Sequence, residues 1–157
     1  MIGSSFLLGT FAGSFVVPRM ADIYGRRPMY ILGLVIFIAS CVGLILSTDI
    51  RAMYAFLFLG GLSESGRCYV GYVYAIEIVP KRMQSLAGLI YWLGPASGKI
   101  FVCLYFMLSK EKEWKVMPFI AIGIAGISLL LTIGFLPESP RYLYAKKRYA
   151  EAQSILR

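Results

Sequence analysis

Three ionisable side chains lie deep inside long apolar stretches of this 157-residue chain, and they are the residues best placed to do chemistry. They are Glu64, Arg67 and Lys99. A charge in hydrocarbon is costly, so such residues pair with one another or face a water-filled cavity. Two cations beside one carboxylate are suited to holding a charged or polar solute. The pattern therefore predicts a binding site for a charged or polar solute.

The depth of these residues follows from the helical rise of about 1.5 Å per residue. Counting back from Glu77, where the stretch meets the surface, places Glu64 roughly 20 Å and Arg67 roughly 15 Å inside. Counting forward from Ser85 places Lys99 at roughly 21 Å, so Glu64 and Lys99 share a depth.

Two interpretations of this cluster remain open. Glu64, Arg67, Gly71 and Tyr74 recur every three or four residues and so share one helix face. In the first interpretation Glu64, Arg67, Tyr74 and Lys99 line a substrate cavity. In the second, Glu64 pairs with Arg67 and Lys99 extends outward to the surface.

Catalysis has no support in the sequence. The chain contains no His and no Asn, which excludes His proton relays, the usual His-based zinc sites and N-glycosylation acceptors. No nucleophile–base pair, phosphate-binding Gly-rich loop or metal-ligand cluster is present, so we expect neither an enzyme nor a cofactor. The three cysteines, Cys41, Cys68 and Cys103, lie inside apolar stretches and do not indicate a disulfide framework.

The elements that must position the cluster are membrane-spanning helices. Apolar residues make up 59% of the chain, charged residues only 15%, and the mean hydropathy is +0.72. The sequence predicts five spans, at residues 2–17, 29–46, 52–79, 86–108 and 116–136. The first is the shortest. A signal peptide is the alternative for it, although no basic residue precedes it and no small-residue cleavage pattern follows it.

Lys and Arg are distributed unevenly between the two ends of these spans. Ten lie on one side: Arg19, Arg26, Arg27, Lys81, Arg82, Arg141, Lys146, Lys147, Arg148 and Arg157. Four lie on the other: Arg51, Lys110, Lys112 and Lys115. The positive-inside rule predicts that the side with ten is cytoplasmic. The net charge of +8 then reflects this asymmetry and attraction to anionic lipid, and nucleic acid is not an expected partner.

Three motifs lie on the predicted cytoplasmic side. Asp22-x-x-Gly25-Arg26-Arg27 forms a short polar hinge, in which Gly25 permits a tight turn and the two Arg reach neighbouring helices. Glu77-x-x-Pro80 ends the third span, although a Glu solvated at the membrane surface is a plain alternative. Pro137-Glu138-Ser139-Pro140-Arg141 follows the last span, and its prolines stop the helix.

These motifs resemble those of the major facilitator superfamily, and in particular of the sugar porters and the organic cation and anion transporters. The resemblance places the five spans as helices two to six, part of an N-terminal six-helix bundle. It implies an all-α integral membrane protein with a bundle at residues 1–136, and a cytoplasmic exit motif and surface helix at 137–157. Pro18, Ile23 and Gln84 depart from the usual motif residues, which are Gly, a basic residue and Arg.

The resemblance also implies a cytoplasmic gate in which charges pair across helices. Its members are Asp22, Arg26, Arg27, Glu77, Arg82, Glu138 and Arg141. We predict an ion pair between Glu77 or Glu138 and an Arg of a different span.

The implied function is transport of a small organic solute, an organic ion or a sugar, by alternating access. The expected partners are the lipid bilayer, the solute, and the missing transporter half or neighbouring membrane subunits. One incomplete half cannot rock about a midplane site alone. The alternative is a reduced transporter relative that acts as a structural subunit of a larger membrane assembly.

Overall fold

The computed structural model describes residues 2–108 and 114–146, and every regular element in these ranges is helical. The elements in chain order are α1 (Ile2–Tyr24), α2 (Arg26–Leu46), α3 (Ile50–Glu64), the π-helical segment η1 (Ser65–Val70), α4 (Gly71–Ile78), the 3₁₀ turn η2 (Lys81–Met83), α5 (Gln84–Leu108), α6 (Val116–Phe135) and α7 (Pro140–Ala145). The predicted all-α class is confirmed.

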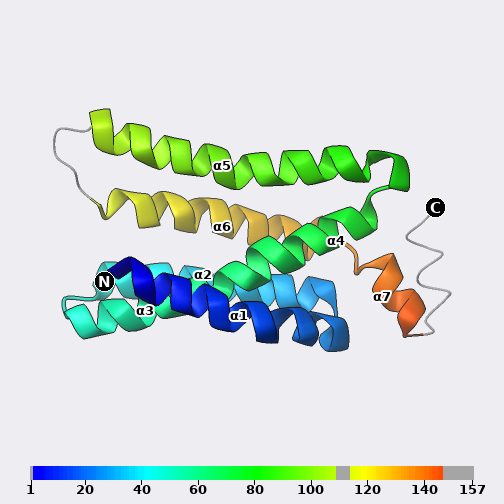
Figure 1. Cartoon of the computed structure of the whole chain (residues 1–157), viewed down its shortest axis with the longest axis horizontal. Helices are drawn as coiled ribbons and strands as arrows, with labels where there is room; N and C mark the ends of the chain where they lie inside the picture. The colour runs from blue at the N-terminus through cyan, green and yellow to red at the C-terminus, as the bar shows by residue number, and fades with distance from the viewer. Residues whose placement is uncertain (1, 109–113, 147–157) are drawn as a thin grey trace.

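The long helices run back and forth between two ends of the molecule (Figure 1). The α1–α2 hinge, the α4–α5 connection and the start of α7 lie at one end, whereas the α2–α3 connection, the end of α5 and the start of α6 lie at the other. The three motif segments therefore share one end, as the five-span prediction requires. Lys110, Lys112 and residues 147–157, including Lys147, Arg148, Arg157 and most of the predicted surface helix, lie outside the described residues.

Four segments in the described residues are long and apolar enough to cross a membrane: Gly3–Tyr24, Arg26–Leu46, Lys81–Leu108 and Val116–Phe135. The third predicted span, 52–79, is helical but divided into α3, η1 and α4, which continue one another across the bundle (Figure 1). A π-helical turn carries hydrogen bonds between residues i and i+5 and so shifts the register of the faces that follow it. The single helix face that was expected to carry the residues from Glu64 to Tyr74 is therefore interrupted.

The hinge is shorter than expected. Instead of ending at Val17, α1 continues through Pro18 to Tyr24, and α2 begins at Arg26. A proline is tolerated in such a helix because neighbouring groups satisfy the freed carbonyl. Gly25 alone makes the turn, with φ of 116°, a conformation that favours glycine.

Glycines let α1 and α3 approach closely. A Cβ added at Gly9 would lie 2.1 Å from the carbonyl oxygen of Phe58, and one added at Gly61 would lie 2.0 Å from that of Phe6. Small residues at four-residue spacing allow this kind of backbone contact between membrane helices. Gly94 and Gly98 in α5 make no such contact among the described residues, because a Cβ at either would meet no atom within 4 Å.

The described residues pack mainly around α2 and the divided third span. Val17, Ala21, Met29 and Val70 form a buried apolar cluster near the hinge, where α1, α2 and η1 meet. Polar bonds support the same contacts: the hydroxyl of Ser65 in η1 donates to the carbonyl of Thr10 in α1 at 3.2 Å. By contrast, α5 buries only Gly88 and exposes most of its length.

Candidate functional site

Arg26, at the first turn of α2, is the hub of a charge cluster at the hinge. Its Nη2 lies 2.8 Å from Oδ1 of Asp22, and its Nε lies 3.2 Å from Oε2 of Glu77 in α4. The side chains of Arg26 and Glu77 are 16% and 6% exposed, whereas that of Asp22 is 68% exposed. The predicted ion pair between Glu77 and an Arg of another span is present.

Glu138 also belongs to this cluster and lies in the exit segment, residues 137–141, which follows α6. Its Oε1 accepts hydrogen bonds from the backbone N–H groups of Arg26 and Arg27, each at 3.1 Å. These are orphan donors at the N-terminus of α2, where the helix dipole also favours a negative charge. The carboxylate of Glu138 therefore caps α2. It binds backbone N–H groups, whereas the prediction had offered an ion pair with an Arg side chain as one possibility.

The exit segment is tied to α4 as well. The hydroxyl of Ser139 donates to Oε2 of Glu77 and accepts the backbone N–H of Tyr142 at 3.3 Å, which caps α7. The hydroxyl of Tyr74, a residue that is 3% exposed, donates to the carbonyl of Pro137. One buried carboxylate, Glu77, thus connects α2, α4 and the segment after α6.

The other predicted gate residues lie around this cluster. Arg27 donates from Nη2 to the carbonyl of Ile133 in α6 at 2.7 Å. Arg82 is exposed in η2, and no ion pair joins it to another residue in the described ranges. Arg141 begins α7 with Pro140, but its side chain lies outside the description. Six of the seven predicted residues are therefore placed, and five of them contact another part of the hinge end.

The predicted midplane pair is also formed. Nη2 of Arg67, in η1, lies 2.6 Å from Oε2 of Glu64, and the thiol of Cys68 donates to Oε1 of Glu64 at 3.1 Å. The guanidinium of Arg67 also stacks on Phe37 of α2, 3.7 Å from the ring centroid. The Nε–H of Arg67 is buried and has no hydrogen-bond partner among the described residues.

Two adjoining hollows lie between α2, the divided third span, α5 and α6. Their volumes are about 350 and 390 Å³, and both are lined by Tyr30, Tyr91, Ile124 and Ser128. Arg67 and Cys68 line the first, and Tyr74 and Thr132 line the second. The two hollows together extend from the middle of the bundle toward the hinge end.

The structure separates the four predicted cavity residues. Arg67 and Tyr74 line the hollows, whereas Glu64 reaches them only through its ion pair with Arg67. Lys99 is exposed on α5 and lines neither hollow. The arrangement thus combines parts of both interpretations: Glu64 and Arg67 pair, and Arg67 still faces a cavity.

Sequence reasoning missed the residues that complete the cavity wall. Tyr30 and Ser128 share a hydrogen bond of 3.2 Å between α2 and α6, and the hydroxyl of Tyr91 donates to the carbonyl of Arg67 at 2.6 Å. Each is a single polar residue in an apolar span, which was the available signal. Among residues 2–108 and 114–146, no group of three or more His, Cys, Asp or Glu is placed to hold a metal ion.

Helices long and apolar enough to cross a membrane, a charge cluster at one end and a partly polar hollow in the middle define a multi-pass integral membrane transporter fold. The chain belongs to the sugar (and other) transporter family, whose model matches residues 1–157. Its major facilitator fold, expected from the motifs, is thereby confirmed.

Curated relatives include members of solute carrier family 22 and a putative metabolite transport protein. Over 156 residues the chain is 31% identical to solute carrier family 22 member 15-like of Xenopus laevis, and that match covers 99% of this chain and 31% of the relative. It is 28% identical over 163 residues to the putative metabolite transport protein YwtG of Bacillus subtilis, covering 99% of this chain and 34% of YwtG. Human solute carrier family 22 member 2 is 27% identical over 154 residues, covering 98% of this chain and 27% of that relative. The chain spans about a third of the length of these relatives.

Solved structures agree on the fold. The xylose transporter XylE from E. coli, in a partially occluded inward-open conformation, superposes with a TM-score of 0.87 at 20% identity, covering 99% of this chain and 43% of XylE. Its inward-open conformation gives a TM-score of 0.84.

Proposed function

We propose that this chain forms part of the N-terminal half of a transporter that moves a small organic solute by alternating access, with Arg67 as a solute-binding residue. One observation carries the proposal. Arg67 lines a hollow in the middle of the bundle, and its side chain remains 23% exposed although it pairs with Glu64. Binding at the middle of the bilayer, between two halves that rock, is how such carriers work.

The cavity wall favours an organic ion over a sugar. Glu64 neutralises one charge of the site, and Tyr30, Phe37 and Tyr91 supply aromatic surface around Arg67. Among the described residues that line the two hollows, Arg67 is the one cation and there is no carboxylate, because Glu64 reaches the cavity only through its ion pair with Arg67. We therefore propose an organic anion with an apolar body as the solute.

In this proposal the hinge cluster is the cytoplasmic gate. Arg26, Glu77 and Glu138 join α2, α4 and the exit segment, and the excess of Lys and Arg at that end favours the cytoplasmic side. When the two transporter halves separate, α2, α4 and the exit segment would have to move together. Glu77 supports such a joint movement because it contacts Arg26 and Ser139.

A structural subunit of a larger membrane assembly is the second candidate. The internal neutralisation of Arg67 by Glu64 favours it, because a closed ion pair serves packing as well as binding. The two functions predict different effects of one substitution.

The test is Arg67→Ala in the full-length protein, with uptake of an anionic and a neutral solute measured per molecule of protein in the membrane. A transporter should lose anion uptake by about tenfold or more, since a lost charged contact is worth roughly 1.5–3 kcal/mol, and should keep more of its neutral uptake. A structural subunit should instead lose abundance or assembly with no change in flux. Equal loss for both solutes would end the anion proposal.

A further inference from the structure

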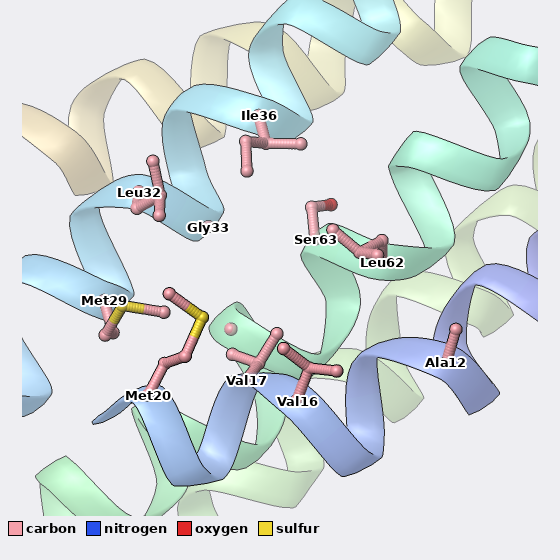
Figure 2. A pocket seen from close by; sticks show the side chains of 11 residues that line it. Ala12, Val16, Val17, Met20, Met29, Leu32, Gly33, Ile36, Leu62 and Ser63 are labelled. Carbon is pink, nitrogen blue, oxygen red and sulfur yellow. The ribbon is translucent and has the colours of Figure 1, made fainter. Parts of the chain in front are cut away.

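A third hollow, almost entirely apolar, lies on the other face of α2. It has a volume of about 190 Å³ and is enclosed by α1, α2 and the end of α3 (Figure 2). Its floor is the close contact of two glycines: a Cβ at Gly33 would lie 3.1 Å from the backbone carbon of Gly66. Met20 and Met29 extend into the gap at its hinge end (Figure 2).

The wall of this groove offers nothing to a polar ligand. Ser63 carries its one side-chain oxygen, and that hydroxyl already donates to the carbonyl of Gly60 at 2.6 Å. A sugar or an ion would lose its hydration without gaining hydrogen bonds. Apolar cavities of about 150 Å³ stay dry and accept hydrocarbon. The occupant that fits this wall is therefore a hydrocarbon chain.

The groove opens sideways, where the bilayer is. Val16 and Leu32 stand at its rim and are 54% and 44% exposed, and both belong to membrane-spanning helices. Counting from Gly25, the groove runs from about 6 Å at Met29 to about 16 Å at Ile36. These depths correspond to about one leaflet of a hydrocarbon core about 30 Å thick, so an acyl chain is the natural neighbour.

The sequence places a cation near the shallow end of the same groove, on α1 next to the lining residue Met20. Arg19 directly precedes Met20 and is exposed, and no ion pair engages it in the described residues. The nearby carboxylate of Asp22 is already held by Arg26 at 2.8 Å. A long basic side chain at this level reaches the headgroup region, where it attracts anionic lipid.

We propose that this groove seats one acyl chain of an anionic phospholipid, with the lipid phosphate at Arg19. The chain fills the gap between α1 and α2 directly beside the hinge. Val17 and Met29 belong both to the groove wall and to the buried cluster at the hinge, so the seated lipid supports the packing of the two helices there.

The test uses the full-length protein in phosphatidylcholine nanodiscs that contain a small fraction of phosphatidylglycerol with a photoreactive acyl chain. Crosslinks should concentrate on the peptides that carry Met20 and Met29. Val16→Trp fills the mouth and should lower this labelling roughly tenfold, the factor that corresponds to burying about two methylene groups. Leu32→Trp blocks the mouth from α2 and should act alike, which separates an effect on the groove from a folding defect of one variant.

Leu8→Trp is the matched control, because Leu8 is 61% exposed on α1 but does not line the groove. Arg19→Gln should lower labelling by the phosphatidylglycerol probe about fivefold and leave a phosphatidylcholine probe unchanged. Equal labelling of the Val16, Leu32 and Leu8 variants would overturn the proposal. So would an unlabelled groove in the unaltered protein, which would mean that another protein segment covers it. Equal capture of both probes by the unaltered protein would overturn the anionic headgroup.

Discussion

At the scale of single residues, Glu77 is the most connected charge of the hinge end. It is almost fully buried and binds Arg26 and Ser139, two residues from different parts of the chain. Removing such a carboxylate lowers the stability of the protein strongly, because the buried cation then loses its buried counter-charge.

Glu77→Ala should therefore lower the free energy of unfolding by about 3–5 kcal/mol, since it removes the buried counter-charge of Arg26 and leaves only the exposed Asp22 beside it. Asp22→Ala removes the exposed partner of the same Arg26 and should cost no more than about 1 kcal/mol. Denaturant titration of the purified protein in mild detergent measures both. Similar losses for the two variants would contradict the ranking of the two ion pairs.

Glu138 gives a second residue-scale prediction. Glu138→Ala leaves two backbone N–H groups of α2 without an acceptor and should cost about 1–2 kcal/mol. Glu138→Gln keeps an acceptor oxygen but loses the charge that favours the helix N-terminus, and should cost about 0.3–1 kcal/mol. The same titration checks the order. A larger loss for Gln than for Ala would show that Glu138 does not act as a cap.

At the scale of the elements, the contact between α1 and α3 depends on glycine. Gly61→Ala places a methyl group against the backbone of Phe6, and the helices must separate to admit it. We expect a loss of about 1–3 kcal/mol in unfolding free energy, as for other overpacked sites.

Gly123→Ala in α6 is the matched control, because a Cβ there would meet no atom within 4 Å. Its effect should stay within about 0.5 kcal/mol, measured in the same titration. If Gly61→Ala were equally harmless, the close contact of α1 and α3 would not exist in the folded protein.

The helices themselves were predictable because apolar runs of membrane-spanning length and short charged connections leave few alternatives. The exact hinge was not, because α1 continues through Pro18, a residue that local rules treat as a breaker. The π-helical turn at η1 was also not predictable, because the composition of Ser65–Val70 does not distinguish it from an α-helical turn.

The site was predictable in part for the same reason. Charged residues such as Arg67 and Glu64 stand out in an apolar span. Tyr30 and Ser128 become wall residues only because α2 and α6 lie side by side, and nothing in the sequence specifies that neighbourhood.

At the scale of the whole molecule, α2 separates two hollows of opposite character. One face carries Tyr30 and Phe37 toward a partly polar cavity, and the other carries Leu32 and Gly33 toward the apolar groove. The hinge cluster holds α2 at the end where the exit segment docks. The central claim is that the first hollow is a solute pathway filled with water and reached from one side of the membrane.

Ser128→Cys tests that claim directly, because Ser128 lines the hollow, whereas Cys41 is buried and Cys103 lies on the exposed surface of α5. Cys68 also lines the hollow, but its thiol already donates to Glu64. Three single-cysteine variants of the full-length protein, with Ser128→Cys, Cys41 or Cys103 as the one thiol, would be treated in membranes with a small, charged, water-soluble thiol reagent. Thiol modification requires water and the thiolate, so neither a packed nor a lipid-facing cysteine reacts readily. The account predicts that the thiol at position 128 alone is modified and that the transported solute slows its modification. A thiol at position 128 as unreactive as Cys41 would contradict it.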